Sequence, residues 1–177
     1  MKLPDALLRF RAKAATVARS VKWGTAKMNT GNDPLERFNA ANETSRKRLA
    51  DLVAGLSPAD LQQKVSYGWS VAMALTHLAF WDFYGVARLD HWEKNGFPEH
   101  HPDVEPINDA MRPMLEAISP ADATRMVITA AESVDKRVKT VGAGLVQAII
   151  RGGRTQVLDR SAHRTLHLDD IEKALGR

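Results

Sequence analysis

Three short segments of the sequence place a helix-capping residue directly before a proline: Asp33-Pro34, Ser57-Pro58 and Ser119-Pro120. Aspartate and serine cap the first turn of a helix, and proline is favoured at the first helical position because its missing N–H has no intrahelical partner there. Each pair therefore predicts the start of a helix or of a helical turn. No alternating run flanked by hairpin signals competes with this pattern, so the sequence predicts an all-α fold.

Apolar residues recur at steps of three and four between these starts, as they do along the buried face of an amphipathic helix. The pattern predicts four main helices, over about 33–55, 70–96, 119–141 and 155–175, and a shorter helix over 107–118. The sequence also predicts a polar crossover over residues 96–106. Four glycines between 142 and 153 indicate an irregular connection between the last two main helices. Four amphipathic helices in one small domain favour a four-helix bundle.

The first 27 residues differ from the rest of the chain in charge. They hold seven basic residues and one acidic residue, whereas the remainder carries a net charge of −2. Their apolar residues follow a helical spacing (Leu3, Leu7, Phe10, Ala14, Val17 and Val21). We therefore expect residues 1–30 to form a basic arm with an extra amphipathic helix, outside a bundle domain over residues 31–177. Such an arm could pack on the protein, lie on an anionic surface or act as a transit peptide.

Length and composition narrow the classes of function. A chain of 177 residues fits one domain, and its lack of cysteine excludes disulfides, thiolate metal sites and a cysteine nucleophile. No apolar run is long enough to span a bilayer, and charges interrupt the N-terminal segment where a secretory signal would lie. We therefore expect a cytoplasmic protein. Because the basic charge is confined to the arm, we do not expect a nucleic-acid partner.

Two of the six histidines, His163 and His167, are spaced as two metal ligands on one helical face would be. The zinc-protease pattern has the same spacing but requires glutamate after the first histidine, where this chain has Arg164. His77 is the best third candidate because it lies in an apolar segment of another long helix, and facing helices of a bundle can build an internal metal site. The alternatives are a hydrogen-bonded core histidine and a surface pair.

The segments that carry these histidines resemble the DinB/YfiT-like superfamily. The resemblance rests on Trp69-Ser70-Val71 followed by Thr76-His77-Leu78, and on a terminal helix with His163, His167-Leu168 and Ile171-Glu172. Ile107-Asn108-Asp109 and Ser119-Pro120 extend it over roughly residues 33–175. The arm lies outside the match.

This resemblance implies a four-helix bundle in which His77, His163 and His167 hold a divalent metal ion. Imidazole ligands suit zinc, nickel, iron or cobalt, and ligand type alone does not choose among them. The superfamily includes hydrolase-like proteins and thiol-dependent transferases and isomerases, among them mycothiol-dependent maleylpyruvate isomerase. Asp159 and Asp170 lie close enough along the helix to orient a ligand imidazole, although solvated charges at a helix edge are the alternative.

Three hypotheses about function follow. The first is a metalloenzyme that activates water or an external low-molecular-weight thiol for hydrolysis or transfer on a small-molecule substrate, with a homodimer as a further expectation. The second is a non-catalytic protein of the same fold that binds a small ligand or a metal. The third treats the histidines as relics in an interaction module. The sequence identifies no catalytic residue and no substrate.

Overall fold

The structure is a computed structural model that describes residues 33–98 and 103–177. Within these residues it contains six α-helices and no strand, which confirms the prediction of an all-α fold. The predicted arm and its helix lie outside the described residues, so the division at residue 30 stays a prediction.

The capping signals mark helix starts as expected. Helix α2 spans Pro34–Ala54, and Asp33 Oδ1 accepts a hydrogen bond from the backbone N–H of Leu35 at 3.0 Å. Helix α3 spans Val71–Asn95 and is capped by Ser70. Helix α4 spans Val104–Ala117, and α5 spans Pro120–Val138 with Ser119 as its cap. Ser57-Pro58 precedes the short 3₁₀ helix η1, Asp60–Gln62.

Two predictions about the last third of the chain are wrong in part. The connection with four glycines contains helix α6, Ala143–Arg151, because Val146 and Ile149 of this segment are buried in a core cluster with Leu89 and Trp92 of α3. The last helix does not begin at residue 155. The chain forms a 3₁₀ helix η2, Thr155–Val157, and then α7, Ser161–Ala174.

A buried asparagine of α2 explains the interruption before α7. Asn42 Nδ2 donates to the carbonyl of Leu158 at 2.8 Å. Asn42 Oδ1 accepts from the backbone N–H groups of Arg160 and Ser161 at 2.7 and 3.1 Å. These bonds satisfy backbone groups that would otherwise pair inside a continuous helix, so the helix begins again at Ser161.

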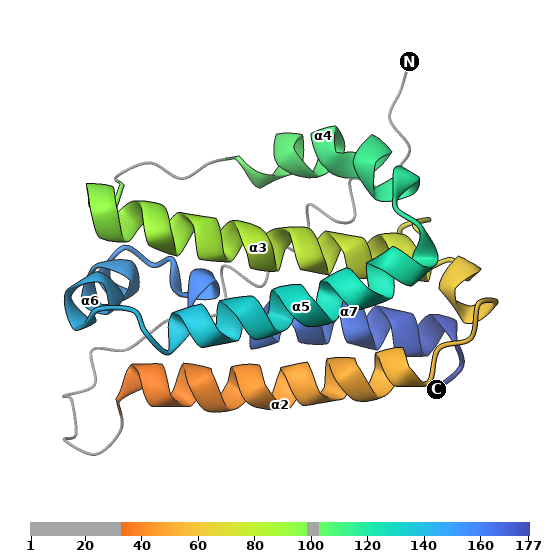
Figure 1. The fold of residues 1–177 in the computed structure, drawn as a ribbon, viewed down its shortest axis with the longest axis horizontal. Coiled ribbons are helices and arrows are strands. Elements are labelled where there is room, and N and C mark those ends of the chain that lie inside the picture. The colour runs from red at the N-terminus through yellow and green to blue at the C-terminus, as the bar shows by residue number, and fades with distance from the viewer. Residues whose placement is uncertain (1–32, 99–102) are drawn as a thin grey trace. The chain divides into compact units, whose positions relative to one another are not determined.

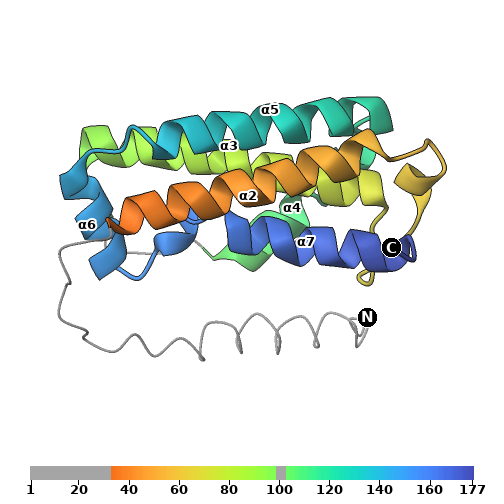
Figure 2. The same ribbon diagram turned by 90° about the horizontal axis from the view of Figure 1, so that it is seen from below.

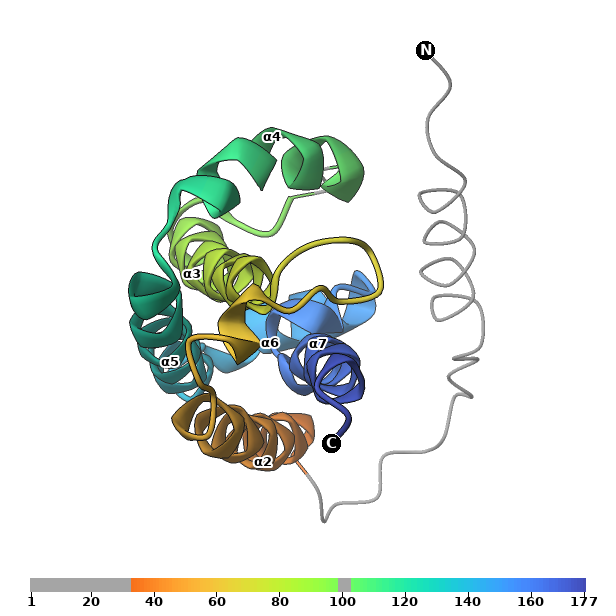
Figure 3. The ribbon, with the colours of Figure 1, turned by 90° about the vertical axis from the view of Figure 1, so that its right-hand side faces the viewer.

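Helices α2, α3, α5 and α7 lie side by side along their length (Figures 1 and 2). Viewed end-on they surround a common interior, and α4 lies on the outside of α3 (Figure 3). The main core cluster fills this interior with residues from all four helices, including Leu49, Leu75, Val127 and Leu168. The candidate site lies between α3 and α7.

Candidate metal centre

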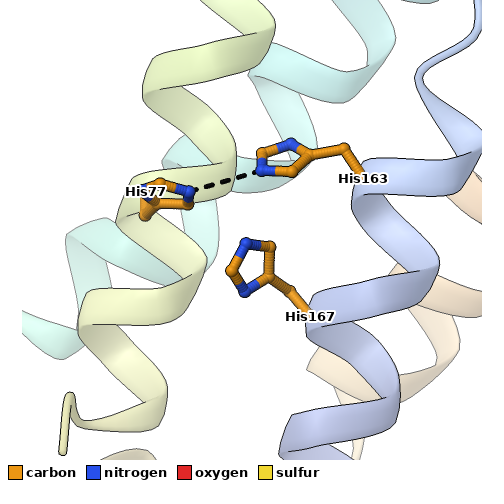
Figure 4. Close-up of side chains that lie close together, drawn as sticks. All are labelled: His77, His163 and His167. Atoms are coloured by element: carbon orange, nitrogen blue, oxygen red, sulfur yellow. Dashed lines mark hydrogen bonds between the residues drawn. The ribbon is translucent and has the colours of Figure 1, made fainter. Parts of the chain in front are cut away.

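The three histidines singled out by the sequence come together between α3 and α7. His77 lies in the second turn of α3, and His163 and His167 lie one turn apart on α7. All three rings point toward one another (Figure 4), and their ligand nitrogens lie within 4.8 Å of one another. The other described histidine, His91, is exposed near the end of α3 and does not join them. His100 and His101 lie outside the described residues.

The distance between His77 and His163 matches that of two ligands on a single ion. The Nε2 atoms of His77 and His163 are 3.3 Å apart. Two nitrogen ligands about 2.0–2.1 Å from one tetrahedral ion lie roughly 3.3 Å apart. The ring centroid of His167 is 4.8 Å from each of the other two centroids. The donor set therefore fits one divalent ion, with positions left for a further ligand.

Burial keeps the three imidazoles uncharged at neutral pH. His77 and His167 are 5% and 2% exposed, and His163 is partly exposed. Desolvation lowers the pKa of His77 to about 2 and the pKa of His167 to about 4. Desolvation, with electrostatic repulsion from His167 when that ring is protonated and from Arg160, holds the pKa of His163 well below its usual value. A neutral imidazole has a free lone pair, which is the form that binds a metal.

The Nδ1 atoms of the three imidazoles differ in their hydrogen bonding. The Tyr67 hydroxyl lies 2.6 Å from Nδ1 of His167, and Arg160 Nη2 donates to Nδ1 of His163 at 3.2 Å. A guanidinium only donates, so Nδ1 of His163 accepts and the ring proton lies on Nε2, facing His77. A cation can therefore bind at this atom only after that proton has left it. Nδ1 of His77 is buried, with no hydrogen-bond partner in the described part of the chain.

Aromatic side chains enclose the His77 side of the centre. The ring centroids of Trp69 and Trp81 lie 5.0 and 6.3 Å from that of His77. Trp81 Nε1 donates to Asn108 Oδ1 of α4 at 3.1 Å, which ties this outer helix to the site. The aromatic rings exclude water from this side of the cluster, so we expect access from the side of the partly exposed His163.

Neither predicted orienting carboxylate contacts a ligand imidazole. Asp159 Oδ1 instead accepts from the backbone N–H of Ser161 at 3.1 Å, where it supports the start of α7. The charge of Asp170 helps burial to raise the pKa of Tyr67. Sequence reasoning missed Tyr67 and Arg160 as neighbours of the histidines. In the sequence, Tyr67 lies between the predicted helices over 33–55 and 70–96, and no local pattern indicates its contact with His167.

Comparison with known proteins gives one finding. A family model described as the DinB superfamily matches residues 41–168, a span that covers well over half of the chain and includes all three histidines. Comparisons with curated proteins and with solved structures gave no match.

Proposed function

The chain belongs to the DinB superfamily, and from this premise we propose that it binds one divalent metal ion through His77, His163 and His167 and acts with it on a small molecule. The convergence of three uncharged imidazoles carries this proposal. Neutral imidazole suits zinc, nickel, iron and cobalt, so the proposal covers all four.

The protein's part in such a reaction is to hold and shield the centre. When bound, a divalent ion supplies Lewis acidity, which lowers the pKa of a water or thiol that reaches it. The chain has no cysteine, so any thiol must be an external, low-molecular-weight one. Trp69 and Trp81 keep water from the His77 side, while Arg160 adds a fixed positive charge beside His163.

One observation favours the alternative, a non-catalytic protein that binds a small ligand or metal. In the part of the chain that the structure describes, no carboxylate hydrogen-bonds any of the three imidazoles, and no side chain stands out as a general base. If the protein is an enzyme, its acid–base chemistry must therefore be supplied at the metal or by the substrate.

No helix within the described ranges is long and apolar enough to cross a membrane. A cytoplasmic location, a small-molecule substrate and a homodimer stay predictions.

Metal analysis of the protein purified without a histidine tag tests the proposal. We expect close to one equivalent of divalent metal per chain, lost in His163→Ala because two ligands hold an ion poorly. His91→Ala, which removes an exposed histidine of α3, provides the matched control and should keep the metal. Wild-type protein that neither carries metal nor takes up zinc, nickel, iron or cobalt in a titration would contradict metal binding.

Turnover assays separate the enzyme from the binding protein. Metal-loaded and metal-free protein should be compared on thiols paired with electrophiles, and on amide and ester substrates. Metal-dependent turnover that His163→Ala abolishes supports the enzyme. Tight ligand binding without turnover over this panel supports the alternative.

A further inference from the structure

The Tyr67 hydroxyl makes the shortest contact with any of the three imidazoles, at 2.6 Å from Nδ1 of His167. Tyr67 does not belong to either helix that carries the histidines. It lies in the turn between η1 and α3, and its ring packs edge-on against that of His167, with the centroids 5.8 Å apart. Tyr67, which lies outside both α3 and α7, therefore contacts His167 of α7.

The backbone of the turn, residues 65–69, holds Tyr67 in place. The N–H of Val65 donates to the carbonyl of Trp69 at 2.9 Å, and the N–H of Gly68 donates to the carbonyl of Val65 at 2.9 Å. Gly68 has a φ of 82°, a conformation that glycine adopts without strain. The rings of Tyr67 and Trp69 meet edge-on with centroids 4.9 Å apart, so the turn directs Tyr67 to His167 and Trp69 to His77.

The chemistry of an imidazole ligand gives this contact a specific role. A neutral imidazole that binds a metal through Nε2 carries its proton on Nδ1, and a hydrogen-bond acceptor at that proton fixes the orientation of the ring. A phenolic oxygen can accept this bond. Of the three Nδ1 atoms, that of His77 has no partner among the described residues, and that of His163 faces Arg160, which cannot accept. Among the contacts described, Tyr67 alone supplies an acceptor.

We propose that Tyr67 is a positioning residue for the metal centre: its hydroxyl oxygen accepts the Nδ1 proton of His167 and so directs Nε2 of that ring toward His77 and His163. This inference rests on the proposed function, because it assumes that the three histidines bind a metal. It adds a residue that neither the histidine spacing nor the family match assigns.

Tyr67→Phe removes the hydroxyl and leaves the ring to pack against Trp69. The chain has two tyrosines, so Tyr84→Phe is a matched control that removes the other hydroxyl. We expect the zinc dissociation constant, measured by titration against a competing chelator, to rise about 10–100-fold in Tyr67→Phe. It should stay at the wild-type value in Tyr84→Phe. The visible spectrum of the Co²⁺-loaded protein should change in Tyr67→Phe alone, because the geometry around the ion changes.

Each outcome of this titration has a definite meaning. Zinc binding by wild type and Tyr67→Phe with equal affinity would overturn the role of Tyr67 and leave the metal centre intact. An equal loss in both tyrosine variants would also overturn it, since the effect would not be specific to the contact with His167. Absence of zinc binding by the wild type would overturn the proposed function and, with it, this inference.

A measurement on the wild type keeps the proposal testable if Tyr67→Phe does not fold. In the zinc-loaded protein, ¹⁵N NMR of the histidine side chains should show metal bound at Nε2 of His167 and a slowly exchanging proton at Nδ1. Metal bound at Nδ1 of His167, or a proton there that exchanges freely with water, would contradict the role of Tyr67.

Discussion

At the scale of single residues, burial keeps the three histidines uncharged, which is the form in which an imidazole can bind a metal. Water stabilises a charged imidazolium, and a ring placed among Trp69, Trp81 and its fellow histidines loses that stabilisation. The pKa of His77 falls to about 2 for this reason, helped by electrostatic repulsion from Arg160 and from His167 once that ring is protonated. In acid, the folded metal-free protein still keeps these rings uncharged, and this costs free energy relative to the unfolded chain, which can protonate them.

This cost predicts a pH dependence for metal-free protein. Between pH 6.5 and about 4 the unfolded chain protonates His77 and His167, while the folded chain does not. Since the unfolded state then binds more protons, the free energy of unfolding falls as the pH falls, by about 1.4 kcal/mol per pH unit for each such histidine. Urea unfolding in the presence of a chelator at pH 7, 6 and 5 measures this slope.

His167→Gln tests whether His167 contributes to this slope. The slope should become shallower by about 1.4 kcal/mol per pH unit in this variant, because one protonation difference is removed. His91→Gln, at an exposed position outside the cluster, should keep the wild-type slope. An unchanged slope in His167→Gln would show that this ring takes up its proton in the folded protein as readily as in the unfolded chain.

The sequence predicts the three histidines better than it predicts their neighbours. A spacing of four on a helix places His163 and His167 on one face, and an apolar setting places His77 inside, so both follow from local rules. The contact from Tyr67 to His167 spans 100 residues and depends on how a turn folds back. Asp159 is nearer along the chain, but its carboxylate bonds to the backbone of Ser161. No rule based on local sequence predicts that Tyr67 contacts a histidine of the cluster and that Asp159 does not.

At the scale of secondary-structure elements, signals in the chain itself predict helix starts more reliably than helix interruptions. Asp33, Ser70 and Ser119 each cap a helix that begins where the sequence indicates. The break before α7 depends instead on Asn42, which lies 116 residues from Leu158 along the chain. Helix α6 is hidden in the sequence by its flanking glycines, although its apolar residues pack into a core cluster.

The turn 65–69 makes a prediction at this scale. Gly68→Ala should lower the free energy of unfolding by about 1–2 kcal/mol, because a residue with a Cβ is strained at a φ of 82°. It should also weaken zinc binding, since the same turn holds Tyr67 and Trp69. Chemical unfolding of metal-free protein and the chelator titration measure the two effects separately.

Gly144→Ala is the control for this substitution. Gly144 lies in the first turn of α6, and a Cβ added there meets nothing within 4 Å. Alanine is also the better helix former, so this variant should be as stable as the wild type or more stable, with unchanged zinc binding. If Gly68→Ala behaved in the same way, the turn would not constrain the site.

At the scale of the whole molecule, a buried charge cluster next to the three histidines joins all four long helices. Arg164 of α7 is fully buried, and its guanidinium bonds to Asp82 of α3 and Asp135 of α5 at 3.0 and 2.8 Å. Burial alone would lower the pKa of Arg164, but the two carboxylates more than offset this effect. From α2, Arg46 bonds to Asp135 at 3.0 Å.

Arg160 connects this cluster to the three histidines. Its Nε donates to Asp82 at 2.8 Å, while its Nη2 donates to His163 at 3.2 Å. An all-α fold follows from caps and periodicity in the sequence, but this cluster does not. In the sequence, Arg164 is the charged residue directly after His163, and a helix pattern assigns such charges to the solvent face. Its burial depends on partners from two other helices.

Asp82→Asn tests how much the fold depends on this cluster. The substitution keeps the size of the side chain and removes one negative charge, which leaves Arg160 and Arg164 with less compensation in a buried site. Breaking a buried ion pair in this way costs about 3–5 kcal/mol. The control, Asp51→Asn, removes the exposed partner of Lys47 and should cost less than about 1 kcal/mol. Urea unfolding of the metal-free proteins measures both. Similar losses in the two variants would mean that the cluster is solvated in solution, and Arg160 would then lack a fixed position beside His163.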